Sequence, residues 1–279
     1  MRLLNRLIGH GPAPLFAAAV MAAGIAVSAP QAANPQAANP QASNPQTAVA
    51  ANPAMIPASA VQQTIRQVPG APIRIMPLGD SLTFGKGDKS ENGYRDSLFT
   101  WLALSGVHAD FVGSQSNGSG ADTGHEGHPG WRIAWLTRHA SYWMTKFRPQ
   151  VVLLDIGTND LLRHQAAGAP KRLNDLIDRM IAADPEVRIV LAKLLVVRGK
   201  HAKEFRSFNA ALTKAAARRP GNVTLVDMSV IPASDTVDGV HPDELGYRKM
   251  AFQWYQGLRT VLPTGRSWER VENPFTSGR

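Results

Sequence analysis

The sequence of 279 residues contains no cysteine. This absence excludes a disulfide framework, a thiolate metal site, a cysteine nucleophile and a cysteine-linked lipid anchor. A dense basic block is also missing, although 30 Lys and Arg against 21 Asp and Glu give a net charge of +9. Charge spread in this way favours contact with acidic polymers or surfaces, and we expect no nucleic-acid partner.

Long apolar runs are scarce. The longest, from Leu15 to Ala29, is shorter than the roughly 20 residues that a membrane-spanning helix needs. Arg2 and Arg6 precede it and small residues follow it, which is the pattern of a secretory signal peptide. We therefore expect a secreted or periplasmic protein, with no stable membrane insertion after cleavage; an uncleaved anchor is the alternative interpretation.

The segment after the apolar run has few large apolar residues. Repeats of the type "NPQAA" begin at Asn34, and their prolines remove backbone donors while their small side chains cannot form a core. The predicted organisation is a signal peptide over residues 1–33, a disordered linker over 34–70, one folded domain over 71–263 and a polar tail over 264–279.

Short apolar runs alternate with helical periodicity in the predicted domain. Five runs are candidate strands: "IRIMPL" from Ile73, "DFVG" from Asp110, "VVLLDI" from Val151, "VRIVLAKLLV" from Val187 and "VTLVDM" from Val223. Four helical faces lie between or after them: Tyr94, Leu98, Trp101 and Leu102; Leu173, Ile177, Met180 and Ile181; Phe205, Phe208 and Leu212; Tyr247, Met250, Ala251, Trp254 and Leu258. This alternation predicts an α/β fold with an open parallel sheet and helices on both faces.

Polar motifs follow three of these strands. Ser81 follows the first in "MPLGDSLTFG", Asn159 follows the third in "GTND", and the loop after the fifth contains Asp238 and His241 in "DGVHPDELG". The carboxyl ends of parallel strands meet at one edge of a sheet, where ligands bind. There His241 would take the proton of Ser81 and Asp238 would orient the imidazole, while Asn159 and backbone N–H groups would stabilise an oxyanion.

Each motif also has an ordinary structural interpretation, as a turn residue, a helix cap or a loop residue. Other catalytic motifs fit less well. "GDSLTFGKG" lacks the spacing and the Ser or Thr of a phosphate-binding P-loop, and Thr83 replaces the second glycine of G-x-S-x-G. "HEGH" lacks the spacing of a helical zinc site, so we predict no metal.

Together these motifs resemble the SGNH or GDSL hydrolase family, whose four blocks contribute serine, glycine, asparagine and histidine. "RIMPLGDS", "GYR", "DFVGS" and "HEGHPGW" in this order are most similar to carbohydrate esterase family three, the acetyl xylan esterase branch. The resemblance implies a three-layer flavodoxin-like domain with a five-stranded parallel sheet and ester hydrolysis without cofactor or metal.

The resemblance also implies roles for individual residues. Ser81 is the expected nucleophile, His241 the base and then acid, and Asp238 the residue that orients it. The N–H groups of Ser81 and Gly130 and the amide of Asn159 are the expected oxyanion hole.

Neighbouring residues have two interpretations each. We expect Asp80 to hold the turn at Ser81 and Asp160 to cap the helix after the third strand, with substrate contact as the alternative for Asp160. Trp131 would stack on a sugar or close the core, and His128 would line the pocket or bond within its loop, as would His125 and Glu126.

The leading hypothesis is a secreted serine esterase that removes O-acetyl groups from carbohydrate, with an acetylated polysaccharide or another small ester as its substrate. A periplasmic lipid ester or thioester hydrolase would use the same residues with an apolar acyl channel, and an acetyltransferase would use them as well. The third possibility is a noncatalytic carbohydrate-binding protein that keeps the fold, because fold alone does not establish activity.

Overall fold

The computed structural model describes residue 65 and the ranges 70–262 and 268–276. The predicted signal peptide, nearly all of the predicted linker and part of the predicted tail lie outside these residues. In the ranges described, no helix has both the length and the hydropathy needed to cross a membrane.

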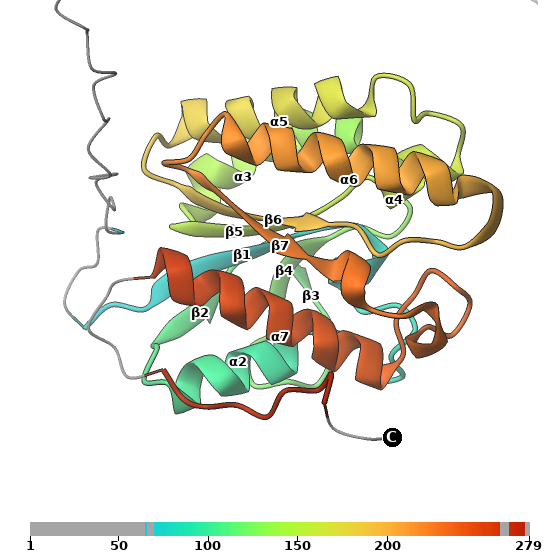
Figure 1. Cartoon of the computed structure of the whole chain (residues 1–279). Helices are drawn as coiled ribbons and strands as arrows, with labels where there is room; N and C mark the ends of the chain where they lie inside the picture. The colour runs from blue at the N-terminus through green and yellow to red at the C-terminus, as the bar shows by residue number, and fades with distance from the viewer. Residues whose placement is uncertain (1–64, 66–69, 263–267, 277–279) are drawn as a thin grey trace, which may run out of the picture. The chain divides into compact units, whose positions relative to one another are not determined.

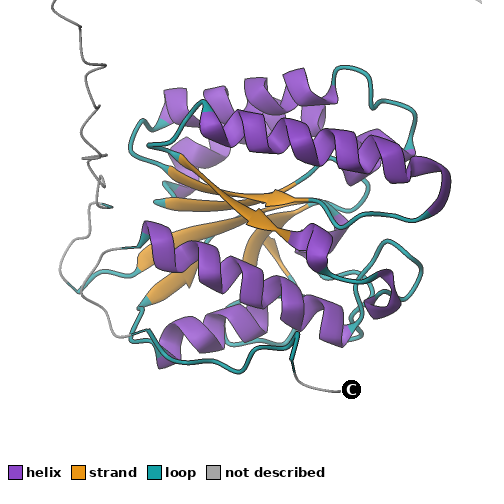
Figure 2. Ribbon diagram, viewed as in Figure 1, coloured by secondary structure: helices purple, strands orange, loops and turns teal. Residues whose placement is uncertain are grey.

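A mostly parallel sheet forms the centre of the domain (Figures 1 and 2). All five predicted strands are present and parallel, in the order β2, β1, β5, β6, β7. Their bounds are Ile73–Gly79 for β1, Ala109–Phe111 for β2, Val151–Asp155 for β5, Arg188–Lys193 for β6 and Val223–Asp227 for β7. Strand β5 is buried at every position, as expected of a parallel strand covered on both faces.

Two further short strands make the sheet seven-stranded rather than five-stranded. Strand β3 (Gln115–Ser116) pairs antiparallel with β4 (Gly124–Gly127), and β4 runs parallel to the end of β1. A Cβ atom at Gly113 would lie 2.1 Å from the carbonyl oxygen of His125, and one at Gly124 would lie 2.0 Å from that of Phe111. These glycines resemble loop residues in the sequence, but here they allow two backbones to approach closely.

Helices cover both faces of the sheet, as Figures 1 and 2 show. One layer holds α2 (Arg95–Leu104) and α7 (Glu244–Val261), and the other holds α3 (Ile133–Phe147), α5 (Ala169–Ala183) and α6 (Ala202–Ala217). Four of these helices contain the predicted faces. The sequence analysis did not single out α3, although its buried residues follow helical spacing: Ile133, Leu136, Ala140, Trp143 and Met144.

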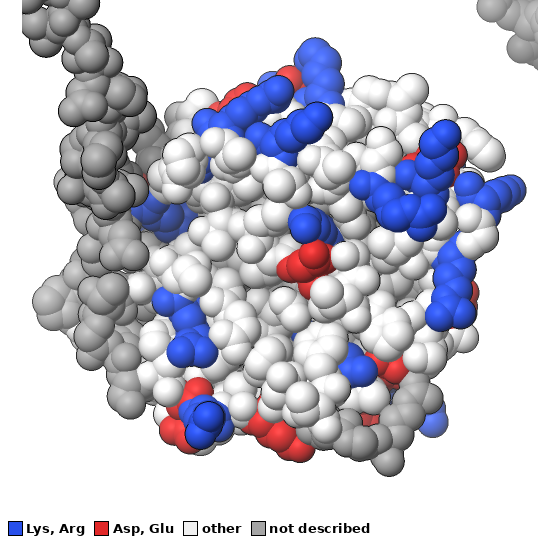
Figure 3. Space-filling view, in the orientation of Figure 1, with Lys and Arg blue, Asp and Glu red and all other residues white. Residues whose placement is uncertain are grey.

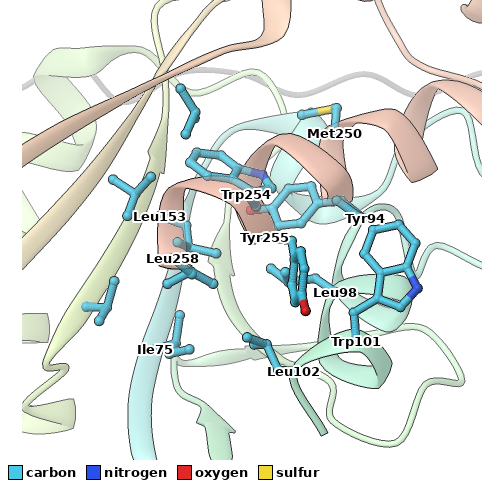
Figure 4. Close-up of a cluster of buried hydrophobic side chains, with 14 of the residues drawn as sticks. Ile75, Tyr94, Leu98, Trp101, Leu102, Leu153, Met250, Trp254, Tyr255 and Leu258 are labelled. Carbon is cyan, nitrogen blue, oxygen red and sulfur yellow. The ribbon is translucent and has the colours of Figure 1, made fainter. Parts of the chain in front are cut away.

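Each helical layer has its own hydrophobic core. The first joins α2 and α7 to one face of the sheet, with Trp254 fully buried near Tyr94 and Leu153 (Figure 4). The second joins α3, α5 and α6 to the other face, where Leu154 lies. Burial of each large apolar side chain contributes about 1.5–3 kcal/mol to stability. Residues of β1 and β5 belong to both cores, so the two cores together fix the ends of these strands.

Short helical segments occupy the connections after these strands. Helix α1 (Ser81–Phe84) follows β1, and α4 (Thr158–Leu162) follows β5. Three 3-10 turns follow β6 and β7: η1 (Gly199–His201), η2 (Met228–Val230) and η3 (Ala233–Asp235). The predicted site residues lie on these segments and on the loops beside them.

Candidate active site

The turn from β1 into α1 presents Ser81. Gly79 has no room for a side chain, because a Cβ atom there would lie 2.2 Å from the carbonyl oxygen of Asp155. Asp80 caps α1, and its Oδ1 accepts a hydrogen bond from the N–H of Leu82 at 3.1 Å. This bond confirms the predicted role of Asp80 in holding the turn, with Ser81 as the first residue of the helix.

Ser81, His241 and Asp238 form a continuous hydrogen-bonded chain. Ser81 Oγ lies 2.9 Å from His241 Nε2, and His241 Nδ1 lies 2.7 Å from Asp238 Oδ2. Because Asp238 accepts a hydrogen bond from Nδ1–H, Nε2 of the neutral imidazole is free to accept the hydroxyl proton. Residues 160 positions apart in the chain therefore meet as the sequence predicts.

The loop that carries His241 is organised by Asp238. Its Oδ1 accepts hydrogen bonds from the N–H groups of Val240 at 2.9 Å and His241 at 2.7 Å, while Oδ2 holds the ring. Partial burial acts to raise the pKa of Asp238, but these hydrogen bonds outweigh it and the pKa falls below its ordinary value. Asp238 is therefore ionised at neutral pH and can stabilise a protonated imidazole.

Asn159 lies beside the nucleophile turn. It belongs to α4, which begins after Gly157, a residue with φ of +131° whose Cβ would lie 2.6 Å from Phe208. Its Nδ2 donates a hydrogen bond to Asp80 Oδ2 at 3.1 Å. An amide nitrogen carries two hydrogens, so a second one remains for another acceptor.

Asp80 therefore joins two of the predicted site residues, Ser81 and Asn159. Burial raises its pKa to about 6, against the lowering effects of the Leu82 hydrogen bond, His241 and Asn159. At neutral pH the group is mostly ionised, which favours its bond to the Asn159 amide.

The segment after β4 brings Gly130 to the same edge. His128 N–H donates to the carbonyl oxygen of Gly79, and Trp131 N–H donates to that of His128, both at 3.0 Å. Gly130 has φ of +80°, a conformation that favours glycine. The N–H of Gly127 is bonded to His125 Nδ1, whereas that of Gly130 has no acceptor within the described part of the chain.

The structure corrects the interpretation of Asp160. Its side chain is fully buried, with Oδ2 accepting from the N–H of Ile133 and Oδ1 paired with Arg172, each at 2.9 Å. Asp160 therefore caps α3 rather than its own helix α4. Since both oxygens are used inside the protein, the alternative role in substrate binding is not available to it.

The other two residues proposed for substrate binding contact each other. His128 Nε2 lies 2.8 Å from Glu126 Oε2, and its ring stacks on Trp131 with centroids 4.1 Å apart. His128 thus bonds within its loop. Trp131 is half-buried, so it packs against the core and still keeps an exposed part.

The "HEGH" segment forms hydrogen bonds as well. His125 Nδ1 accepts from the N–H of Gly127, so its Nε2 carries the proton and donates to Asn117. Glu126 accepts from both the N–H and the hydroxyl of Ser114. Among the described residues, no three His, Asp or Glu side chains are grouped as metal ligands.

Sequence reasoning assigned no role to Arg95. Its guanidinium is almost fully buried and donates to four carbonyl oxygens, those of Phe84, Glu91, Asn117 and Thr123. Burial lowers the pKa of Arg95. The motif "GYR" contains this residue, but no local pattern shows that it binds loops on both sides of the site.

The fold and these strand-end residues define the class of protein, a hydrolase of the SGNH type. The model of the GDSL-like lipase/acylhydrolase family matches residues 78–249, and the chain belongs to this family.

Individual relatives agree with this assignment. A multidomain esterase of Ruminococcus flavefaciens is 30% identical over 240 residues, which cover 71% of this chain but only 31% of that protein. The structure of a family 3 carbohydrate esterase of Clostridium thermocellum is 32% identical, with a TM-score of 0.63 over 68% of this chain and 97% of that one. A family 3 carbohydrate esterase of Talaromyces cellulolyticus, at 24% identity and a TM-score of 0.60 over the same shares, supports the fold.

Proposed function

We propose that this chain is a serine esterase that removes O-acetyl groups from carbohydrate through an acyl-enzyme on Ser81. The observation that carries the proposal is the continuous chain from Ser81 Oγ through His241 to Asp238, with contacts of 2.9 and 2.7 Å. Both contacts lie within hydrogen-bond reach, the geometry that activates a serine hydroxyl.

In the acylation step, Ser81 Oγ attacks the carbonyl carbon of the ester as its proton passes to His241 Nε2. The bond between the acyl carbon and the sugar oxygen then breaks, and His241 returns the proton to the departing sugar hydroxyl. Asp238 stays ionised and stabilises the imidazolium between these transfers. The products at this point are the deacetylated sugar and acetyl-Ser81.

Water completes the reaction by the same route. His241 takes a proton from water as the water oxygen attacks acetyl-Ser81, and the Ser81 oxygen recovers that proton as acetic acid leaves and then ionises to acetate. In both steps the negative oxygen of the tetrahedral intermediate would accept hydrogen bonds from Ser81 N–H, Gly130 N–H and Asn159 Nδ2. The unused Gly130 N–H and the second Asn159 hydrogen support this role.

A polar cleft between α2 and α7 would suit a hydroxyl-rich substrate. Its volume is ≈ 510 Å³, and Asp88, Asn92 and Glu244 contribute to its lining, whereas Ser81 and His241 do not. Gly87 precedes Asp88, and a Cβ atom there would lie 3.0 Å from His241 Cβ, so the loop that lines the cleft passes close to the histidine. The carbohydrate esterases among the similar structures point to the same substrate class.

Export would place the enzyme where extracellular polysaccharide is available. The support is the sequence of residues 1–33, with its basic start, apolar run and small residues.

Purified protein should be assayed on 4-nitrophenyl acetate, 4-nitrophenyl octanoate and acetylated xylan, with Ser81→Ala as the control. We expect acetate release from the polysaccharide, faster turnover of the acetyl than of the octanoyl ester, and no activity in the variant. A preference for octanoate would instead indicate a lipid ester hydrolase. Turnover that is absent, or unchanged in Ser81→Ala, would indicate a noncatalytic protein on this fold.

A further inference from the structure

We propose that Arg163 binds a carboxylate on the sugar chain, so that the substrate is an acidic, uronic-acid-bearing acetylated glycan. This inference rests on the proposed function and specifies its substrate. It arises from the position of one guanidinium group at the predicted oxyanion hole.

Arg163 lies between the two elements that supply the predicted oxyanion donors. It follows α4 directly, and its N–H donates to the carbonyl oxygen of Asn159 at 3.2 Å. Its Nη2 lies 3.4 Å from the position that a Cβ atom would take at Gly130. The cation therefore lies close to Gly130 and belongs to the segment that carries Asn159.

The guanidinium of Arg163 is exposed and unused. Within the described ranges it has no ion pair, no side-chain hydrogen bond and no aromatic ring beneath it. Its neighbour Arg172 differs, because that side chain pairs with Asp160 and also donates to backbone carbonyl oxygens. The donors of the Arg163 guanidinium are not used within the described residues, so they are available to a ligand.

A second cation follows the same turn. Arg132 lies two residues after Gly130, and its guanidinium carbon lies 4.8 Å from the centre of the Trp135 ring. No carboxylate pairs with it in the part of the chain that the structure describes. The half-buried Trp131 lies between Gly130 and Arg132 in sequence, and its ring stacks on His128.

A cation beside the predicted oxyanion hole suits an acidic sugar. A guanidinium binds a carboxylate through two parallel hydrogen bonds. The net charge of +9 would attract a polyanionic chain, and the blue Lys and Arg groups are more prominent than the red Asp and Glu groups on the face shown in Figure 3. A neutral glycan would gain nothing from the charge of Arg163.

The test compares Arg163→Gln with wild type on three esters: 4-nitrophenyl acetate, an acetylated neutral xylo-oligosaccharide, and the same oligosaccharide bearing a glucuronic acid branch. Arg138→Gln is the matched control, since Arg138 is exposed on α3 outside the site. We expect wild type to prefer the acidic oligosaccharide, with a preference that declines in salt. Arg163→Gln should raise KM for that substrate on the order of tenfold and change KM for the two neutral esters much less.

Two results would overturn the inference. One is a wild-type enzyme that does not prefer the acidic oligosaccharide. The other is an Arg163→Gln variant whose kcat falls equally on all three esters, since such a loss would mean that the cation acts on the oxyanion or on the turn itself. Binding of both oligosaccharides to Ser81→Ala, measured by calorimetry, needs no turnover. Tighter binding of the acidic one that disappears with Arg163→Gln would support the inference even if the esterase assay failed, and equal binding would refute it.

Discussion

Two loops meet at the active edge, and they differ in what holds them. The histidine loop, residues 236–242, is closed by its own atoms: Val237 N–H donates to the carbonyl oxygen of His241, and Asp238 binds two N–H groups and the imidazole. The glycine loop, residues 112–131, has internal bonds as well, such as those of Glu126 to Ser114, but it also binds a distant side chain, the buried Arg95.

The two loops therefore contribute differently, the histidine loop to catalysis and the glycine loop to stability. The histidine loop presents a reacting group on a frame that needs few distant contacts, so its substitution should remove activity and leave the fold intact. The glycine loop supplies the turn with Gly130 only if buried polar groups hold it in place. Changes there should lower the free energy of unfolding and reduce activity as a consequence.

The largest expected effect belongs to the histidine loop. His241→Ala removes the base, and kcat/KM on 4-nitrophenyl acetate should fall on the order of 10⁴-fold. The imidazole is partly exposed and the loop keeps its Asp238 bonds to backbone, so the free energy of unfolding should change by less than about 1 kcal/mol. A urea titration checks stability, and a large loss of stability would show that the loop is not self-contained.

Arg95→Met should reverse this pattern. The change removes hydrogen bonds to four carbonyl oxygens, of which those of Phe84 and Glu91 keep a bond from Asn117 Nδ2, and we expect the free energy of unfolding to fall by about 3 kcal/mol. Urea unfolding measures the loss, with Arg138→Met as the exposed control. If the Arg95 variant were as stable as wild type, the glycine loop would not depend on this clamp.

Asn159→Ala examines the element between the two loops. Loss of one oxyanion donor should lower kcat about a hundredfold. KM should change little, because the donor is used in the transition state more than in the bound substrate. Steady-state kinetics on 4-nitrophenyl acetate separate the two constants. A raised KM with unchanged kcat would assign Asn159 to substrate binding.

The same contrast explains which parts of the site could be predicted from sequence. Asp238 and His241 lie three residues apart, so one turn of chain determines their geometry, and Ser81 and Asn159 follow strands with clear apolar patterns. The order of the strands then brings these motifs to one edge.

Contacts between distant segments could not be predicted in this way. Strands β3 and β4 depend on glycines that permit close backbone approach, and Asp160 caps a helix that begins 27 residues earlier in the chain. The carbonyl oxygens that bind Arg95 are spread from Phe84 to Thr123. None of these partners is adjacent in sequence, and each depends on the folded path of a loop.

The smallest expected effect is the stability that the protein loses at acid pH because of His125 in the glycine loop. Burial, with Arg95 and His128 nearby, lowers the pKa of His125 to about 3 from an ordinary 6.5. His125 therefore binds a proton below about pH 6.5 in the unfolded chain, but only below about pH 3 in the folded protein. Stability from the neutral ring is present above pH 6.5 and is lost as the pH falls, by about 2 kcal/mol at pH 5.

Asp80 acts in the opposite direction. Its pKa of about 6 is raised by burial, so protonation favours the folded state as the pH falls from 6 towards 3.8. The wild-type profile thus combines both groups, and His125→Asn isolates one of them, since Asn offers an acceptor near the place of Nδ1 but no titrating ring. Between pH 7 and 5 the free energy of unfolding of the variant should fall by about 2 kcal/mol less than that of wild type, as measured by urea unfolding. The reason is that Asp80 still titrates in the variant but residue 125 does not. Parallel profiles for the two proteins would mean that His125 does not couple the glycine loop to pH.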